Sequence, residues 1–459
     1  MAQRELISVP TLTGHGIGNI KAHNLRAVLL TLLHQGPTSR VRLAQLTGLS
    51  STTITNLIAE LLDQGIVAET GKEGPAGAGA ANHRDGNGRT GAGRPATLVG
   101  IVPSARCAAG LHFGVDTIRV GVSDLFGNLL CYRVLPHPPD LSPARLLDRA
   151  ADEIEDAIAQ ACVSRTALVG VGVGASGLVD PESGVNVVAP NLGWHDVPIR
   201  EILARRLKVP VFVDNNVRAM ALAEAMFGAG RGVSTLAFVY SRVGVGAGFV
   251  VGGDVYRGSR AGAGEIGHTT MIPAGGAPCR CGNTGCLEML VSEPEIVRQA
   301  HVLAARAPDS LLAIELTKDE GRRTEDESSA EIVGRLSSSV VGEVADEALD
   351  APIERVFAAA RGGDRETLAM LDERAFYMGT ALANLVNLVN PDMIILGGLF
   401  AAGADLMLPR IEETMRRRAF AGLGDAVALC VTSFGRRVGA VGAAALALDA
   451  FFYRQETAS

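Results

Sequence analysis

Three of the seven cysteines in this sequence fall within one short, glycine-rich stretch, and a histidine lies shortly upstream. They are Cys279, Cys281 and Cys286, with His268 before them. Zinc in proteins is bound by thiolate and imidazole ligands in a tetrahedral arrangement, and glycines let a loop turn tightly enough to bring four such groups together. Because four protein ligands leave no coordination position open, we expect one structural zinc ion per chain. The alternative is a group of unrelated buried thiols.

The residues around this cluster resemble the zinc- and sugar-binding signature of the ROK family, which comprises sugar kinases and sugar-responsive repressors. The motif reads Gly264-Glu-Ile-Gly-His268, followed by Cys279-x-Cys281-Gly-x-x-Gly-Cys286-Leu-Glu288. The similarity extends from about Arg94 to the C-terminus. It implies an α/β actin-like (ribonuclease H-like) domain with two lobes around a cleft, and a sugar or sugar phosphate as the ligand.

Sugar hydroxyls both donate and accept hydrogen bonds, and carboxylates and amides can bind two neighbouring hydroxyls at once. The resemblance assigns sugar contacts to residues of this type, and it places one ring nitrogen of His268 on the metal and the other on the sugar. The candidate sugar-binding residues are Asn191, Asn215, Asn216, Glu265, His268 and Glu288. For Glu265 and Glu288 the alternative role is support of the metal loop.

The groups that a sugar kinase uses for phosphoryl transfer are changed in this sequence. ROK kinases remove the hydroxyl proton with the Asp of a Glu-Asn-Asp-Ala-Asn segment, and the matching run here is Asp214-Asn-Asn216-Val-Arg218. Asn216 is an amide and cannot act as a general base, and the loss of that group costs about two to four orders of magnitude in rate. We therefore expect no catalytic residues and no enzymatic activity.

The two phosphate-binding loops implied by the resemblance also differ from those of the kinases. In the first loop His112 stands where the kinases have an acidic residue, and Asp116 puts a negative charge in a turn that must receive an anion. In the second loop Arg242-Val-Gly244 replaces Gly-Thr-Gly. A later pair, Gly397-Gly398, remains as in the kinases, but two glycines alone are weak evidence of nucleotide binding.

The composition describes a globular protein of two or three domains. The chain has 459 residues, of which 47% are hydrophobic and 20% charged, and its net charge of −7 argues against a protein that is basic throughout. No apolar run reaches the length of a membrane span, and residues 1–20 lack the pattern of a secretion signal, so we expect a cytoplasmic protein. The remaining cysteines, Cys107, Cys131, Cys162 and Cys430, are expected to be reduced thiols in the core.

The N-terminal part of the chain has the helical periodicity of a small DNA-binding domain. Apolar residues from Leu25 to Leu33 recur at helical spacing, a second helix begins near Ser39, and a third helix follows a Ser cap before a short strand at residues 66–68. Two helices joined by a glycine-containing turn, with a helix before and a strand after, predict a winged helix-turn-helix over residues 21–70. Residues 1–20 are expected to be a flexible arm.

The third helix carries small hydroxyl and amide side chains on the face away from its apolar stripe. Such side chains suit hydrogen bonds to base edges and phosphates in a major groove, and two arginines lie at the entry to the second helix. The candidate DNA-binding residues are Arg40, Arg42, Ser51, Thr52, Thr53, Thr55 and Asn56. The alternative is a helical interaction module that binds no DNA.

Residues 71–93 are so rich in glycine, alanine and polar residues that they cannot bury a core, so they predict a linker or an extended wing. From residue 94 to 459, buried strands alternate with helices, which indicates an α/β architecture. Residues 316–329 are a polar insertion that we expect to be mobile.

Together these features predict a sugar-responsive transcriptional regulator, a repressor, whose partners are double-stranded operator DNA and a sugar or sugar phosphate. We expect a homodimer or higher homo-oligomer, because such DNA-binding domains read two half-sites. Two alternatives remain open: an active ATP-dependent sugar kinase with an accessory N-terminal module, and a DNA-binding regulator whose cleft binds no sugar.

Overall fold

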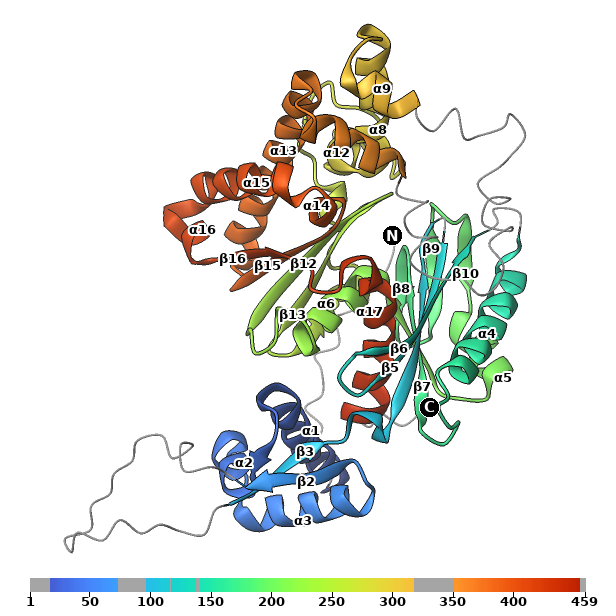
Figure 1. The fold of residues 1–459 in the computed structure, drawn as a ribbon, viewed down its shortest axis with the longest axis vertical. Coiled ribbons are helices and arrows are strands. Elements are labelled where there is room, and N and C mark those ends of the chain that lie inside the picture. Colours follow the sequence, from blue (N-terminus) through green and yellow to red (C-terminus); the bar gives the residue numbers. More distant parts are fainter. Residues whose placement is uncertain (1–16, 73–95, 116, 138–140, 318–350, 455–459) are drawn as a thin grey trace, which may run out of the picture. The chain divides into compact units, whose positions relative to one another are not determined.

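The computed structural model describes residues 17–72, 96–115, 117–137, 141–317 and 351–454. They form two compact units (Figure 1). The first unit runs to Val102 and includes a short C-terminal stretch that begins at Phe452, and the second runs from Pro103 to Phe451. Most of the expected arm, linker and polar insertion lies outside the described residues. No helix in the described part of the chain is long and apolar enough to cross a membrane.

The first unit has the winged helix-turn-helix arrangement that the periodicity predicts. Its three helices pack on an antiparallel sheet with the strand order β1-β3-β2. The elements are α1 (Ile17–Gln35), β1 (Thr38–Ser39), α2 (Arg40–Thr47), α3 (Ser51–Asp63), β2 (Val67–Lys72) and β3 (Thr97–Ile101). The Ser50 hydroxyl caps α3 by accepting a hydrogen bond from the Thr53 backbone N–H at 3.1 Å. Helix α1 begins at Ile17, inside the stretch expected to be an arm, and it includes Gly18.

The first lobe of the second unit is a five-stranded sheet with the order β11-β7-β4-β5-β6, in which β11, β7 and β4 are parallel. Helices α4 and α5 pack against this sheet, and a small antiparallel sheet, β10-β9-β8, adjoins it. The elements are β4 (Cys107–Phe113), β5 (Thr117–Asp124), β6 (Leu129–Pro136), α4 (Pro143–Gln160), β7 (Leu168–Ala175), β8 (Leu178–Asp180), β9 (Val185–Ala189), β10 (Trp194–Val197), α5 (Ile199–Leu207) and β11 (Val211–Asn215).

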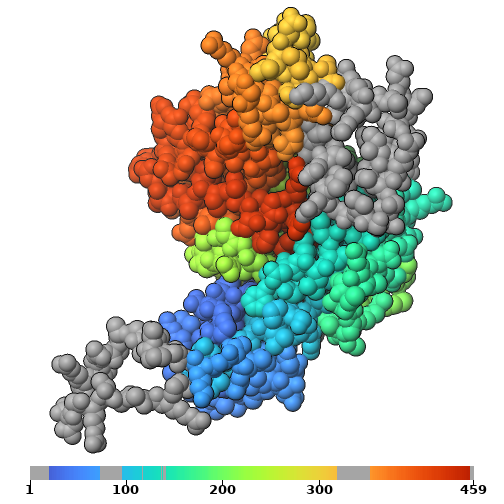
Figure 2. Space-filling model, in the orientation of Figure 1, coloured from blue at the N-terminus to red at the C-terminus, as the bar shows by residue number. Residues whose placement is uncertain are grey.

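The second lobe is built on another five-stranded sheet, with the order β14-β13-β12-β15-β16. Each lobe has its own apolar core, and Figure 2 shows their surfaces as separate colour blocks, teal and green for the first lobe and mainly orange for the second. The elements are α6 (Asn216–Met226), β12 (Thr235–Ser241), β13 (Val245–Val251), β14 (Asp254–Tyr256), α7 (Glu288–Val291), α8 (Glu293–Arg306), α9 (Leu311–Thr317), α12 (Ala351–Arg361), α13 (Arg365–Val389), β15 (Met393–Gly398), α14 (Leu399–Ala402), α15 (Ala404–Arg418), α16 (Leu423–Ala426), β16 (Ala428–Val431) and α17 (Val438–Ala447).

Helices α6 and α17 pack together between the two sheets (Figure 1). Every residue of α17 is buried, which fits its composition of alanine, glycine, valine and leucine on all sides. The helix lies so close to the first sheet that a Cβ at Gly172 would stand 1.8 Å from the Ala443 carbonyl oxygen. Small residues on both partners therefore allow the backbones of helix and sheet to meet.

The four cysteines outside the cluster are free, as expected, but they are not all core residues. Cys107 and Cys131 are buried, and burial raises the pKa of the Cys107 thiol to about 11. Cys162 is exposed just after α4, and Cys430 is only partly buried. The expectation of a core position was wrong for Cys162, because it lies beyond the end of α4, where the chain turns with a φ of 54° and its side chain faces solvent.

Candidate functional site

The ends of three parallel strands and a set of loops from the second lobe surround one cavity of about 370 Å³. The strands β4, β7 and β11 point their carboxyl ends at the same edge of the sheet, which is where ligands bind in parallel α/β sheets. All six candidate sugar-binding residues line this cavity. The structure thus brings together Asn191 after β9, the turn at Asn215 and Asn216, and the more distant Glu265, His268 and Glu288.

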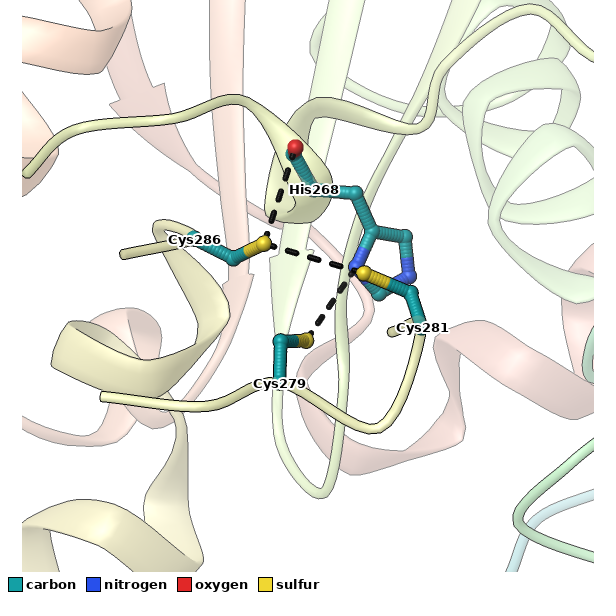
Figure 3. A group of neighbouring side chains, drawn as sticks. All are labelled: His268, Cys279, Cys281 and Cys286. Atoms are coloured by element: carbon teal, nitrogen blue, oxygen red, sulfur yellow. Dashed lines mark hydrogen bonds between the residues drawn. The ribbon is translucent and has the colours of Figure 1, made fainter. Parts of the chain in front are cut away.

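The predicted metal ligands also meet in space (Figure 3). One ligand atom from each of His268, Cys279, Cys281 and Cys286 lies within 4.8 Å of the others. The Cys281 and Cys286 sulfurs are 3.8 Å apart, and the Cys279 sulfur is 3.7 Å from His268 Nδ1. A zinc–sulfur bond of about 2.3 Å in a tetrahedron separates neighbouring sulfurs by about 3.8 Å. The four ligand atoms therefore fit a metal ion of this size.

The thiols of the cluster differ in how readily they ionise. A hydrogen bond from the Asn283 backbone lowers the pKa of the exposed Cys281 thiol, whereas burial raises the pKa of Cys286 to about 12. A metal ion would be bound by the thiolate form, so its binding would require Cys286 to lose its proton. The ion would hold together a loop that is mostly exposed and has little core of its own.

His268 presents its two ring nitrogens to different neighbours. Its Nδ1 faces Cys279, and its Nε2 lies 4.0 Å from a carboxylate oxygen of Glu265, whose side chain is 55% exposed. Glu288 begins α7 directly after the metal loop and accepts a hydrogen bond from the Val245 backbone N–H at 3.0 Å. Both carboxylates thus lie at the cavity beside the metal cluster, which is compatible with ligand binding and with support of the loop.

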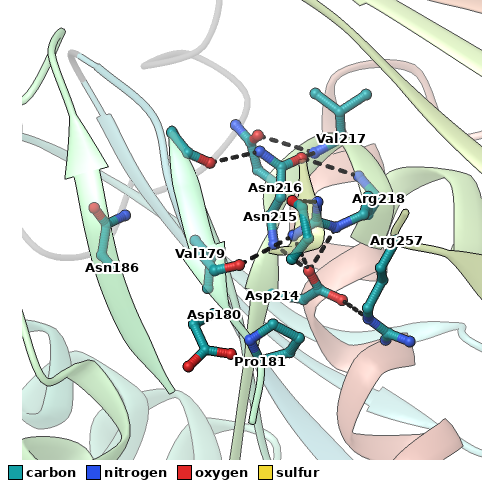
Figure 4. A network of polar contacts seen from close by, with 12 residues as sticks. Val179, Asp180, Pro181, Asn186, Asp214, Asn215, Asn216, Val217, Arg218 and Arg257 are labelled. Atoms are coloured by element: carbon teal, nitrogen blue, oxygen red, sulfur yellow. Dashed lines mark hydrogen bonds and ion pairs between the residues drawn. The ribbon is translucent and has the colours of Figure 1, made fainter. Parts of the chain in front are cut away.

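The amides of the turn after β11 are partly used within the protein (Figure 4). Asn215 caps α6 through its side-chain oxygen and donates to the Gly177 carbonyl at 3.0 Å. Asn216 donates from Nδ2 to the Ser176 hydroxyl at 3.1 Å. The carboxylate of Asp214 is fully buried and pairs with two arginines, so it is not among the groups that line the cavity.

His112, near the end of β4, also lines the cavity. Burial, together with the charges of Arg119 and Arg242, lowers the pKa of His112 to about 3, so the imidazole is neutral at ordinary pH. Arg242 and Gly244 from the turn between β12 and β13 face the same space. Among the described residues that line the cavity, the carboxylates are Glu265 and Glu288.

Comparison with known proteins identifies the second unit. The sequence profile of the ROK family matches residues 108–450. The chain belongs to the ROK family. It is 31% identical to a glucokinase from Halalkalibacterium halodurans, over 74% of this chain and 94% of that protein. It is 29% identical to a xylose repressor from Caldicellulosiruptor bescii, over 87% of this chain and 89% of that protein.

A solved ROK family transcriptional regulator, described as a homologue of the Escherichia coli Mlc protein, has the same overall fold. It shares 25% identity with this chain, covers 95% of it and 98% of its own length, and superposes with a TM-score of 0.73. The ROK actin-like fold expected from the metal-loop motif is therefore confirmed, with a winged helix-turn-helix before it.

The candidate DNA-binding residues of this ROK protein lie on α2 and α3 of the first unit. Thr52, Thr55 and Asn56 are exposed on α3, as are Ser51 and, on α2, Arg42. Thr53 is half-buried and shares a hydrogen bond with the Ser50 hydroxyl at 2.9 Å. Arg40 lies 3.3 Å from the carboxylate of Glu69 on β2, so part of its charge is already paired.

Several residues of the ROK cleft were not singled out from the sequence as ligand contacts. Arg280 lines the cavity and donates to the Asn191 side-chain oxygen at 2.9 Å, which joins the metal loop to the first lobe. Ser176 and Tyr240 also line it. The position of Arg280 could have been predicted from the sequence, because it lies between the two metal ligands Cys279 and Cys281 and must therefore lie near the cavity.

Proposed function

We propose that this protein is a sugar-responsive transcriptional repressor. Its first unit would bind operator DNA, and its ROK cleft would bind a sugar or sugar phosphate with a structural zinc ion beside the ligand. The observation that carries the proposal is the extent of the similarity to the xylose repressor. The alignment with the xylose repressor spans 401 residues, 87% of the chain, which is longer than the second unit from Pro103 to Phe451. The similarity therefore extends into the winged helix-turn-helix of the first unit.

The chemistry of the cavity supports a ligand rich in hydroxyl groups. Its lining combines the carboxylates of Glu265 and Glu288 with the amides of Asn191, Asn215 and Asn216. Each of these groups can hydrogen-bond a sugar hydroxyl, and a cavity of about 370 Å³ is large enough for a monosaccharide. The relatives named after xylose and glucose point to such sugars as the first ligands to test.

The residues of the base position support ligand binding without phosphoryl transfer. A general base must reach the hydroxyl proton and accept it. Asn216 occupies the base position of the kinase motif, but its amide cannot accept a proton. The neighbouring carboxylate of Asp214 is buried and paired with Arg218 and Arg257. The cleft would then hold a sugar without activating its hydroxyl group.

Control of DNA binding follows if the sugar binds two arrangements of the protein with different affinities. A ligand shifts an equilibrium only by the difference between its affinities for the two states. The cleft lies between two lobes, and its lining comes from both, so a bound sugar contacts both lobes when they are close together. We expect a dimer, because two winged helix-turn-helix units would read two half-sites of an operator.

Fluorescence anisotropy with an operator tests the proposal. An operator is first selected from random DNA by the purified chain, and binding is then measured with and without D-xylose, D-glucose and glucose 6-phosphate. The double variant Thr52→Ala/Asn56→Ala should lower operator affinity about tenfold to a hundredfold without changing sugar binding. Gln64→Ala, at the other end of α3, is the matched control. Selection of no specific DNA sequence would refute the proposal.

An active sugar kinase is the second candidate, favoured by the 31% identity to the glucokinase. It requires ATP-dependent phosphorylation of a sugar by the purified wild-type chain. A coupled assay that detects turnover abolished by Asn216→Ala would support the kinase and contradict the repressor without catalysis.

A further inference from the structure

Arg218 occupies the last position of the altered Asp214–Arg218 run and makes a network of buried contacts (Figure 4). Its side chain is 3% exposed, and that of Asp214 is 0% exposed. Arg218 Nε donates to one carboxylate oxygen of Asp214 at 2.7 Å, and Arg257 Nε donates to the other at 2.8 Å. One buried carboxylate therefore pairs with two guanidinium groups, one from α6 and one from the loop after β14.

The same guanidinium of Arg218 also reaches two backbone carbonyls in other segments. Nη1 donates to the Ala261 carbonyl at 2.6 Å, and Nη2 lies 3.4 Å from the Val179 carbonyl in β8. Asp214 and Val179 belong to the first lobe, whereas Arg257 and Ala261 belong to the loop that follows β14 of the second. Arg218 thus joins segments of both lobes through donors that are fixed in one plane.

The loop that Arg218 contacts has an unusual backbone. Arg260 and Ala261 both lie in the left-handed region, with φ of 53° and 52°, although neither is a glycine. Non-glycine residues persist in this region only where the surrounding structure holds them, and such residues gather at functional sites. The hydrogen bond from Arg218 to the Ala261 carbonyl supplies that restraint at a residue that is only 8% exposed.

This loop leads directly to the cavity. Gly264 has φ of 104°, and its carbonyl accepts a hydrogen bond from the Ala247 backbone N–H at 2.7 Å; Glu265 follows it at the cavity wall. The Asp214 turn leads to the other wall, where Asn215 and Asn216 stand. The guanidinium group of Arg218 therefore contacts the segments that lead to both cavity walls, the Asp214 turn and the loop before Glu265. It does not itself line the cavity or contact a candidate ligand residue.

We propose that Arg218 is a positioning residue for effector binding, which ties the loop that carries Glu265 to the turn that carries Asn215 and Asn216. This inference rests on the proposed function, because it concerns the site where the sugar would bind. It gives a role to the residue that departs from the kinase motif: an arginine at this position converts a catalytic segment into a structural link between the cleft walls.

A lysine at this position separates the proposed role from simple neutralisation of Asp214. Arg218→Lys keeps a positive charge near the carboxylate, but one ammonium group cannot reach Asp214, Ala261 and Val179 together. Arg218→Asn restores the amide of the kinase motif and removes both charge and reach. If Arg218 positions the two cavity walls, both variants should weaken sugar binding and make the backbone of residues 259–265 more mobile.

Two measurements on the full-length chain test this. Calorimetry with D-xylose, D-glucose and glucose 6-phosphate should show sugar affinity reduced about tenfold to a hundredfold in both variants, since each lost hydrogen bond involves a charged group. Hydrogen exchange without any sugar should show faster exchange of the amides in residues 259–265. The zinc content should stay at that of the wild type, because the metal loop is not touched.

Arg298→Gln is the matched control, because Arg298 is an exposed arginine on α8 that pairs with Glu295 away from the cavity. Arg257→Gln keeps the proposal testable if Arg218→Asn does not fold, and it should raise the same exchange rates to a smaller extent. If Arg218→Lys binds sugar and exchanges amide hydrogens as the wild type does, Arg218 does not position the two cavity walls. If the wild-type chain binds none of the sugars, the proposed function fails, while the exchange experiment still decides whether Arg218 holds the loop.

Discussion

The two walls of the cleft are held in opposite ways. The metal loop is mostly exposed, although two of its four ligands, Cys279 and Cys286, are buried, so a bound ion would provide much of its rigidity. In the turn from Asp214 to Arg218, the residues that do not face the cavity are buried, and the side chains hydrogen-bond to one another and to other segments. One wall would therefore depend on a bound metal ion, whereas the other is held by hydrogen bonds and ion pairs within the chain.

The two walls can therefore be tested separately. Glu265, His268 and Glu288 stay with the metal loop, where they can contact a ligand. The base position has an amide, and the surrounding residues pair with each other. Each of the following experiments disturbs one wall and leaves the other intact.

Loss of the metal should have the largest effect. Cys281→Ser removes one of four ligands, and structural zinc sites contribute about 10 kcal/mol or more of binding free energy. We expect the metal content, measured by mass spectrometry, to fall from one ion per chain to near zero, and sugar binding to be lost with it. Cys162→Ser, which replaces an exposed cysteine elsewhere, should keep the ion. A Cys281→Ser protein with a full complement of zinc would show that the ligand set is wrong.

Glu288→Gln tests whether this carboxylate binds the sugar or only supports the loop. The amide keeps the size of the side chain and can still accept the hydrogen bond from Val245. If Glu288 binds sugar hydroxyls as a charged acceptor, calorimetry should show an affinity about tenfold to a hundredfold lower. Glu295→Gln outside the cavity is the control. Unchanged affinity in Glu288→Gln would assign this residue to loop support alone.

A smaller effect is expected at the mouth of the cleft. Arg280→Gln removes the exposed hydrogen bond to Asn191, worth about 1 kcal/mol, so sugar should dissociate about fivefold faster in stopped-flow measurements. Asn191→Asp gives Arg280 a charged partner and should slow dissociation instead. Equal rates in the wild type and both variants would mean that this contact does not close the cleft.

The smallest change is expected when the kinase base is restored. Asn216→Asp puts a carboxylate where ROK kinases have one, yet His112 and Arg242 still replace groups of the phosphate loops. A coupled assay with ATP and D-glucose should therefore detect no turnover in either the wild type or the variant. Substantial turnover of ATP and D-glucose by Asn216→Asp would show that the missing base at residue 216 alone separates this cavity from that of an active kinase.

The sequence predicted the metal cluster from a local pattern, and the family resemblance supplied the six residues that line the cavity. Cys279, Cys281 and Cys286 were recognised by their spacing within one loop, and the cavity residues were assigned from the resemblance to the ROK family. The winged helix-turn-helix followed from helical periodicity and a serine cap. The α/β architecture of the second unit was also predicted, because its buried strands are continuous apolar runs that alternate with helices.

The network behind the cleft could not be predicted in the same way. Arg257 and Ala261 are 43 residues away from Asp214 and Arg218 respectively, and no spacing rule links them. The sequence showed that Arg218 departs from the kinase motif, but only the fold shows which groups its guanidinium meets. The bond between Arg280 and Asn191 was missed for the same reason, since it joins segments 89 residues apart.

Helix α17 has a consequence for how such proteins diversify. Its backbone touches the sheet at Gly172, where a Cβ atom would stand 1.8 Å from the Ala443 carbonyl oxygen, so even alanine at this position would force the helix and the sheet apart. A change in what the cavity binds is therefore expected to cost less stability in the loops around the cavity, where side chains point into open space, than at this contact between helix and sheet.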